Sequence, residues 1–353
     1  MASIGWLCSY TPIELILAAG FTPFRITGHV ESPRAADTYM SANICQFVRS
    51  VVDMVTEGKY DHLRGVVFVN SCDAMRRLHD VWKRIKPNQA LHMIDLPVNQ
   101  TSADLVYFER EVTRFRSVLD QWVEKKITDK AIVEATRTIG RARALYQELL
   151  ALRKEIPPRI GGIEMKSLTE NFFSGSIDTW IQNTEKLLAT KRAGKKTKAT
   201  TYHPRLLLEG CPDHSPGLIS LIQESEMDVV YENTCSGSRF FDIAVKETGI
   251  IIADISKAYF HKPTCARMMQ LDERATHIIE KAKEFKVDGI INYSLKFCDT
   301  YQYDVPALKK RLQAAGLNVL AIESDGTASS AAQLKTRFEA FKEVLMNKRS
   351  DTA

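Results

Sequence analysis

The sequence lacks the features that mark several large protein classes. No apolar run approaches the ~18–20 residues of a membrane-spanning helix, and the opening segment has no basic stretch followed by an apolar one, so no signal peptide is expected. The glycine-rich dinucleotide motif, the Walker phosphate loop and the G-x-S-x-G nucleophile motif are also absent. The net charge of +5 is weak evidence for a nucleic-acid partner. We therefore expect a cytoplasmic protein with neither a membrane nor a nucleic acid as partner.

Closely spaced cysteines are missing too. Neither the C-x2-C pairs of structural zinc sites nor the cysteine run of ferredoxins occurs. The seven cysteines are Cys8, Cys45, Cys72, Cys211, Cys235, Cys265 and Cys298. An odd number without an export signal argues against a disulfide framework and favours free, catalytic or metal-bound thiolates. Ligands so far apart in the sequence would have to converge from loops of two domains.

Hydrophobic periodicity predicts an α/β protein. Continuous apolar runs such as 65–69 are typical of strands buried on both faces, and they alternate with helical segments. The spacing of apolar residues over 105–122 and 132–152 predicts two long amphipathic helices instead. We expect two Rossmann-like or flavodoxin-like parallel-sheet domains, at 1–100 and 201–353, separated by a helical segment and basic linker at 101–200.

The first expected strand–turn–helix unit carries a capping signal. Thr11 is predicted to be the helix N-cap, with Pro12 at the first helical position and Glu14 completing a capping box.

Four cysteines are expected at the carboxyl ends of strands, where open α/β sheets bind their ligands. They are Cys72, Cys211, Cys235 and Cys298. Any single one of them could be a small buried hydrophobe. Four in one topological position favour a ligand-binding role.

Three segments resemble a known superfamily, the 2-hydroxyacyl-CoA dehydratase and benzoyl-CoA reductase subunits. They are 5–25 (GWLCSYTPIELILAAGFTPFR), 288–299 (DGIINYSLKFCD), and 323–325 (ESD) followed by 333–341 (QLKTRFEAF). The resemblance implies a [4Fe-4S] cluster at the domain interface, held by Cys45, Cys72 and Cys298. It also implies a separate iron–sulfur activator that hydrolyses ATP to supply low-potential electrons, and a homodimer.

Three further segments resemble the double-cubane branch of this superfamily: 209–212 (EGCP), 232–239 (ENTCSGSR) and 263–265 (PTC). Membership of that branch implies an [8Fe-9S] cluster with six cysteine ligands, the second cubane being held by Cys211, Cys235 and Cys265. Cys8 is left over as a structural residue, with the alternative that it replaces Cys211 as a ligand. The sequence departs from the family in opening at the first strand, without an N-terminal helical extension, and in having Gln46 where proline is common.

Three functions remain open. The first is a double-cubane reductase that receives electrons from the activator and reduces a small unsaturated molecule. The second is the single-cubane [4Fe-4S] subunit of a heterodimeric 2-hydroxyacyl-CoA dehydratase or benzoyl-CoA reductase, and the third is a non-catalytic electron carrier or cluster scaffold. A low-potential donor requires few positive charges near its cluster, and helix starts after Cys72 and Cys235 could donate backbone N–H groups to it. Arg239 is expected to form a surface salt bridge, with anchoring of a substrate or cluster anion as the alternative.

Overall fold

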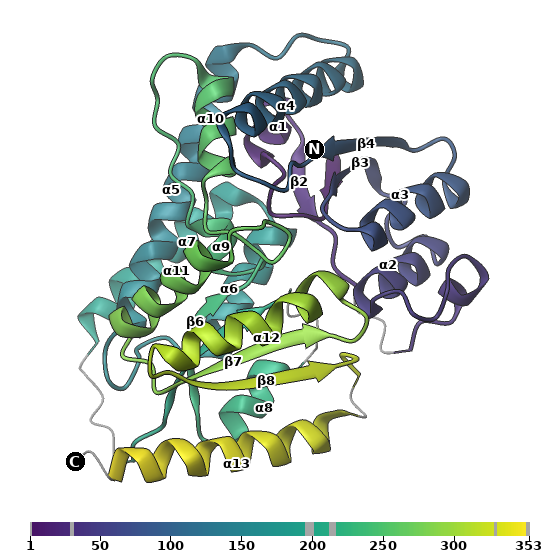
Figure 1. Ribbon diagram of the computed structural model, residues 1–353. Helices are drawn as coiled ribbons and strands as arrows, with labels where there is room; N and C mark the ends of the chain where they lie inside the picture. Colours follow the sequence, from purple (N-terminus) through teal and green to yellow (C-terminus); the bar gives the residue numbers. More distant parts are fainter. Residues whose placement is uncertain (1, 29–31, 195–200, 212–216, 328–329, 351–353) are drawn as a thin grey trace.

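Two parallel four-stranded sheets form the framework (Figure 1). The computed structural model describes residues 2–28, 32–194, 201–211, 217–327 and 330–350. The strands of the first sheet, in the order β2-β1-β3-β4, are β1 (Ser3–Trp6), β2 (Thr22–Arg25), β3 (Leu63–Asn70) and β4 (Ala90–Asp95). Those of the second, in the order β6-β5-β7-β8, are β5 (Arg205–Gly210), β6 (Asp228–Asn233), β7 (Gly289–Leu295) and β8 (Asn318–Ser324). Both sheets therefore have the same strand order, which confirms the parallel α/β architecture expected from the sequence.

Helices cover both faces of each sheet (Figure 1). Those following the first strands are α1 (Ile13–Ala18), the short 3-10 helix η1 (Ala35–Thr38), α2 (Gln46–Thr56) and α3 (Asp73–Ile85). The second sheet is accompanied by α8 (Leu218–Glu224), α9 (Ser238–Phe241), α10 (Ile251–Phe260), α11 (Leu271–Glu284), α12 (Asp299–Ala314) and α13 (Ala331–Ser350). Because both faces are covered, β3 is buried along almost its whole length and β7 along all of it.

Four helices connect the sheets. They are α4 (Ser102–Val123), α5 (Asp129–Arg153), α6 (Gly162–Ser174) and α7 (Ile177–Ala193). The two long helices were expected, whereas α6 was not, because Gly161 and Gly162 are usually helix breakers. Gly161 is in fact the N-cap residue, and a Cβ on Gly162 would lie 2.8 Å from Cγ2 of Ile219, so the second glycine permits close packing.

The basic run 191–198 is only partly a linker. Helix α7 continues to Ala193, and the ammonium of Lys191 lies 2.8 Å from the carboxylate of Glu164. The remainder, from 195 onward, falls outside the described residues. Within the described ranges no helix combines the length and the apolar character needed to cross a membrane.

The predicted capping box at Thr11 is wrong. Helix α1 has Pro12 as its N-cap without a side-chain hydrogen bond, and Glu14 is buried instead. Its Oε1 accepts a 2.7 Å hydrogen bond from Arg143 of α5, and its Oε2 accepts another of 2.7 Å from the hydroxyl of Tyr259 of α10. A buried carboxylate needs such partners. Glu14 therefore joins α1 to two distant helices rather than capping its own.

His92 on β4 should make the stability of the protein depend on pH. Its ring is 7% exposed and stacks on Phe115 at 5.5 Å. Burial, reinforced by Arg114, lowers the pKa of His92 to about 4, from about 6.5 in an unfolded chain. As the pH falls from 6.5 towards 4, the unfolded chain takes up a proton that the folded protein excludes, so folding stability decreases.

Replacing this ring with phenylalanine (His92→Phe) should keep the stack and remove the titration. At pH 7 the change should be small, whereas near pH 4 the variant should gain up to roughly 3 kcal/mol over the parent. Urea unfolding at a series of pH values measures the difference. The exposed His62→Gln is the matched control, and parallel pH profiles of parent and His92→Phe would contradict the prediction.

Candidate functional site

Five cysteines lie at the carboxyl ends of strands. Cys8 comes two residues after β1, and Cys72 two residues after β3. In the second sheet Cys211, Cys235 and Cys298 follow β5, β6 and β7. The first and third strands are neighbours in each sheet, and the crevice at such a position is where open α/β sheets bind ligands.

Cys45, Cys72 and Cys298 form a first set of thiols, called set I below. Burial, and then the thiols of Cys298 and Cys72, raise the pKa of the Cys45 thiol. Burial raises the pKa of Cys298 to about 12, and the thiol of Cys72 contributes to the increase. These mutual effects mean that the three thiols predicted for one cluster lie within electrostatic range of one another.

Each member of set I is also the N-cap residue of a helix. Cys45 precedes α2, Cys72 precedes α3 and Cys298 precedes α12. The backbone N–H groups of the first turns lie close to all three thiols and lower the pKa values that burial raises. Three helix N-termini therefore point at one place, an arrangement that favours negative charge. The helix start expected after Cys72 is confirmed, whereas Cys235 is followed only by the four-residue helix α9.

Cys8, Cys235 and Cys265 form a second set, called set II below. Burial, and then the thiols of Cys235 and Cys265, raise the pKa of Cys8 to about 12. Burial and Cys235 likewise raise the pKa of Cys265. Cys235 differs from both, because three basic side chains lower its pKa despite burial.

Those basic side chains are Arg239, Lys262 and Arg25, and all three are buried. Lys262 Nζ donates to Oγ of Ser9, beside Cys8, at 2.8 Å and to the carbonyl of Arg239 at 3.1 Å. Arg25 donates to the carbonyl of Cys235 at 2.6 Å.

Arg239 is fully buried rather than on the surface, which corrects the expectation of a surface salt bridge. Its guanidinium donates to the carbonyl of Gly210 and lies 3.5 Å from the carboxylate of Glu209. The EGCP and ENTCSGSR segments thus contact each other in the core, although Pro212 itself lies outside the described residues.

Several polar atoms around set II have no hydrogen-bond partner among the described residues. They are the hydroxyls of Tyr10 and Tyr301 and Nε of Arg25 and Arg239. Both tyrosines interact electrostatically with the thiols of Cys235 and Cys265, which raise their pKa values together with burial. Buried donors without partners are rare in native proteins, and here they surround three thiols. These donors could form hydrogen bonds to a buried anion bound at the three thiols.

Cys211 is held by backbone hydrogen bonds at the end of β5. Its Sγ accepts a 3.2 Å hydrogen bond from the backbone N–H of Leu295, and its own N–H donates to the carbonyl of Tyr293 at 3.2 Å. The thiol of Cys8, in contrast, lies within electrostatic range of Cys235 and Cys265, which both raise its pKa.

The two sets are neighbours. Cys265 of set II contributes to the raised pKa of Cys72, and Cys235 contributes to that of Cys298. In the described part of the chain no three His, Cys, Asp or Glu side chains come close enough to share a single metal ion. A cubane makes a weaker demand on spacing, because each of its thiolate ligands binds a different iron. The donor set, six buried or half-buried thiols, fits iron–sulfur chemistry.

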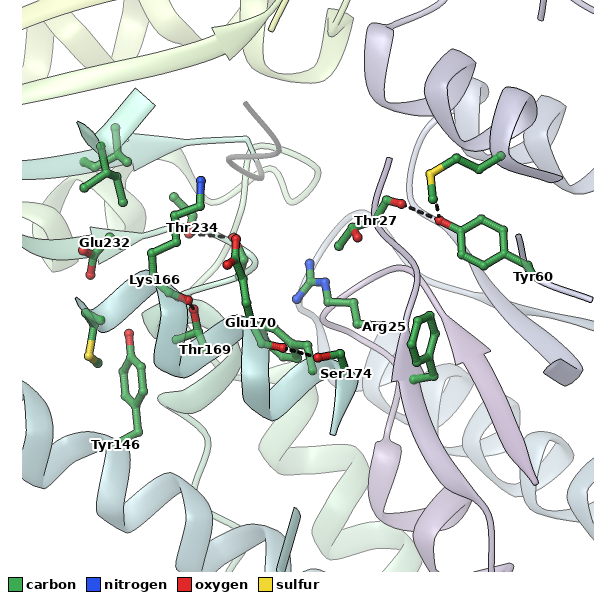
Figure 2. Close-up of a pocket in the computed structure, with 18 residues that line it drawn as sticks. Arg25, Thr27, Tyr60, Tyr146, Lys166, Thr169, Glu170, Ser174, Glu232 and Thr234 are labelled. Carbon is green, nitrogen blue, oxygen red and sulfur yellow. Dashed lines mark hydrogen bonds between the residues drawn. The ribbon is translucent and has the colours of Figure 1, made fainter. Parts of the chain in front are cut away.

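A cavity of about 380 Å³ lies beside set II, between β2, α6 and the end of β6 (Figure 2). Thr234, Ser236 and Gly237 line it, so the segment that carries Cys235 forms part of its wall. Figure 2 shows the guanidinium of Arg25 pointing towards Glu170 across the cavity. Its volume is within the range of small-molecule pockets.

Sequence reasoning missed Lys262 and Arg25. Lys262 stands three residues before Cys265, a signal that was available in the sequence. Nothing local marks Arg25, the last residue of β2, because its contact with Cys235 depends on how the two halves of the chain pack together.

Known proteins of one family match the chain along almost its whole length. The family model of the 2-hydroxyglutaryl-CoA dehydratase D-component matches residues 8–345. The chain is 25% identical to the beta subunit of (R)-phenyllactyl-CoA dehydratase from Clostridium sporogenes, over 97% of this chain and 91% of that protein. It is 24% identical to the beta subunit of (R)-2-hydroxyglutaryl-CoA dehydratase from Acidaminococcus fermentans, over 97% and 92%. It is also 24% identical to one of the subunits of benzoyl-CoA reductase from Thauera aromatica, over 87% and 81%.

Proposed function

The chain belongs to the 2-hydroxyglutaryl-CoA dehydratase D-component family, and from this premise we propose that it is an iron–sulfur reductase with a double-cubane [8Fe-9S] cluster. In this proposal Cys45, Cys72 and Cys298 hold one cubane and Cys8, Cys235 and Cys265 the other. An ATP-hydrolysing iron–sulfur activator supplies the electrons, the substrate is a small unsaturated molecule, and the working form is a homodimer.

The observation that carries the proposal is the presence of six thiols in two adjacent groups of three. Mutual effects on pKa support each group, and effects between Cys72 and Cys265 and between Cys298 and Cys235 support their adjacency. A single cubane would use three of these thiols and leave the other three without a role. Two linked cubanes use all six.

The residues around the cluster would then have separate roles. When bound, the cluster would supply electrons at low potential. The helix starts at set I and the buried cations at set II favour the negative charge of a thiolate-bound cluster. Burial of Cys265 limits access of water. The neighbouring cavity has room for a small molecule, whereas the nucleotide and pantetheine arm of a coenzyme A thioester would have to extend out of it.

The names of the relatives favour a second candidate function. The relatives are beta subunits of two dehydratases and one of the subunits of a reductase, so this chain could be the [4Fe-4S] subunit of a heterodimeric enzyme that acts on an acyl-CoA. A third, non-catalytic function as electron carrier or scaffold requires no substrate at all.

Iron content separates these functions. Anaerobically purified protein should contain about eight iron atoms per chain if the double cubane is present and about four if a single cubane is. Acid-labile sulfide should rise in parallel. A value near four would contradict the proposal and favour the dehydratase subunit. Substrate turnover with activator and ATP would exclude the carrier.

A further inference from the structure

The two thiol sets lie in opposite electrostatic surroundings. Around set I the full charges that follow the ligands directly in sequence are acidic, Asp73 after Cys72 and Asp299 after Cys298. Around set II the buried charges closest to the thiols are basic, because Lys262 Nζ donates to Oγ of Ser9, next to Cys8, and Arg25 donates to the carbonyl of Cys235.

The degree of burial increases this contrast. Arg239 and Lys262 are 0% and 3% exposed, and Arg25 is 3% exposed. The side chain of Asp73 is 62% exposed, and it pairs with the exposed Arg76 at 3.1 Å. A charge inside the protein acts through a lower effective dielectric constant than one at the surface, where water and salt screen it.

Opposing contributions do not remove the difference. Three helix N-termini, each worth about half a positive charge, act on set I, but the two acidic residues in their first turns offset them. The half-buried Arg267 also reaches this region, where it is bonded to the carbonyl of Leu96 at 3.0 Å. At set II, within the part of the chain that the structure describes, Glu209 is the one carboxylate paired with any of the three cations. Set II therefore keeps a larger net positive charge.

Hydrogen-bond donors strengthen the same asymmetry. The hydroxyls of Tyr10 and Tyr301 are buried beside set II, and neither has a hydrogen-bond partner in the described ranges of the chain. Positive charge and hydrogen bonds to sulfur both raise the reduction potential of an iron–sulfur cluster. We propose that set II holds the more easily reduced iron–sulfur unit, so that an electron delivered by a low-potential iron–sulfur donor settles there, and that Lys262 and Arg239 set this order. The inference rests on the proposed double-cubane function.

Anaerobic potentiometric titration of the iron-loaded full chain, followed by electron paramagnetic resonance, tests the inference. Two one-electron reduction waves are expected. Lys262→Met should lower the midpoint of the higher wave by at least a factor of ten in the reduction equilibrium, which is about 59 mV. Lys262→Arg keeps the charge and should restore it. Lys257→Met, the loss of an exposed lysine on α10, is the matched control and should change neither wave.

Two more variants cover the case in which Lys262→Met fails to load iron. Tyr301→Phe removes only a hydroxyl group. It should lower the midpoint of the same wave by about a factor of three in the reduction equilibrium. Asp73→Asn should raise the lower wave and leave the higher one unchanged.

The outcomes separate the two proposals. This inference alone would be overturned if the protein held about eight iron atoms per chain and Lys262→Met and Tyr301→Phe either shifted the lower wave or shifted no wave. About four iron atoms and a single wave would overturn the double-cubane function and this inference together.

Discussion

Replacing Cys8 with serine should remove about half of the iron from the protein, whereas the same change at Cys211 should remove none. The thiol of Cys8 interacts with those of Cys235 and Cys265, and serine is a poor ligand for iron. We therefore expect about four iron atoms per chain in Cys8→Ser, against about eight in the parent.

Cys211→Ser should be well tolerated because the Sγ of Cys211 accepts a hydrogen bond from the N–H of Leu295. A serine hydroxyl can accept in its place, so the expected loss of stability is only about 1 kcal/mol. Cys235→Ser is the positive control and should lose as much iron as Cys8→Ser.

Iron and acid-labile sulfide assays on the anaerobically prepared variants measure these effects. If Cys211→Ser lost half of the iron and Cys8→Ser kept it, the sixth ligand would be Cys211, as the sequence first indicated. Full iron in all three variants would contradict the existence of a second cubane.

Most of the framework could be predicted from local patterns. Strand β3 contains the continuous apolar run at 65–69, and α3 (Asp73–Ile85) follows it, in line with the expected alternation of strands and helices. The buried face of α13, with Leu334, Phe338 and Phe341, also follows directly from helical periodicity. Local sequence suffices for such elements because each buries one face, or in β3 both faces, in a regular pattern.

Elements that depend on distant contacts were missed. Helix α10 packs against α4 and α5, and six of its ten residues are buried, so no clear polar face marks it in the sequence. Helix α12 begins at Asp299 with Cys298 as its N-cap and continues through Pro306, although a proline by itself indicates a helix start. Glu14 looked like a capping residue because its partners, Arg143 and Tyr259, are more than a hundred residues away.

The same limit applies to the candidate site. That cysteines follow strands could be deduced from topology. Cys8 and Cys211, however, both follow the first strand of a sheet with the same strand order, so local pattern cannot tell which of them turns towards Cys235. The choice depends on how the two sheets face each other, and so does the burial of Arg25 against Cys235.

A methyl group at Gly210 should destabilise the protein severely. Gly210 ends β5 with a φ of +145°, and a Cβ there would lie 1.9 Å from the carbonyl oxygen of Tyr293. That oxygen belongs to the neighbouring strand β7 and accepts the N–H of Cys211. A collision between two backbones cannot be relieved by rotating a side chain. Gly210→Ala should therefore lose at least about 3 kcal/mol of unfolding free energy.

Gly140→Ala is the matched control for this change. Gly140 lies inside α5, and a Cβ there would meet nothing within 4 Å, so alanine should add about 0.5–1 kcal/mol through its higher helix propensity. Urea unfolding of both metal-free variants measures the contrast, and a Gly210→Ala midpoint equal to that of the parent would contradict the prediction. The carbonyl of Gly210 also accepts from Arg239. In any Gly210→Ala protein that folds, the guanidinium of Arg239 should be displaced. The midpoint of the higher reduction wave should then fall as well, because the end of β5 that positions Cys211 also positions this cation of set II.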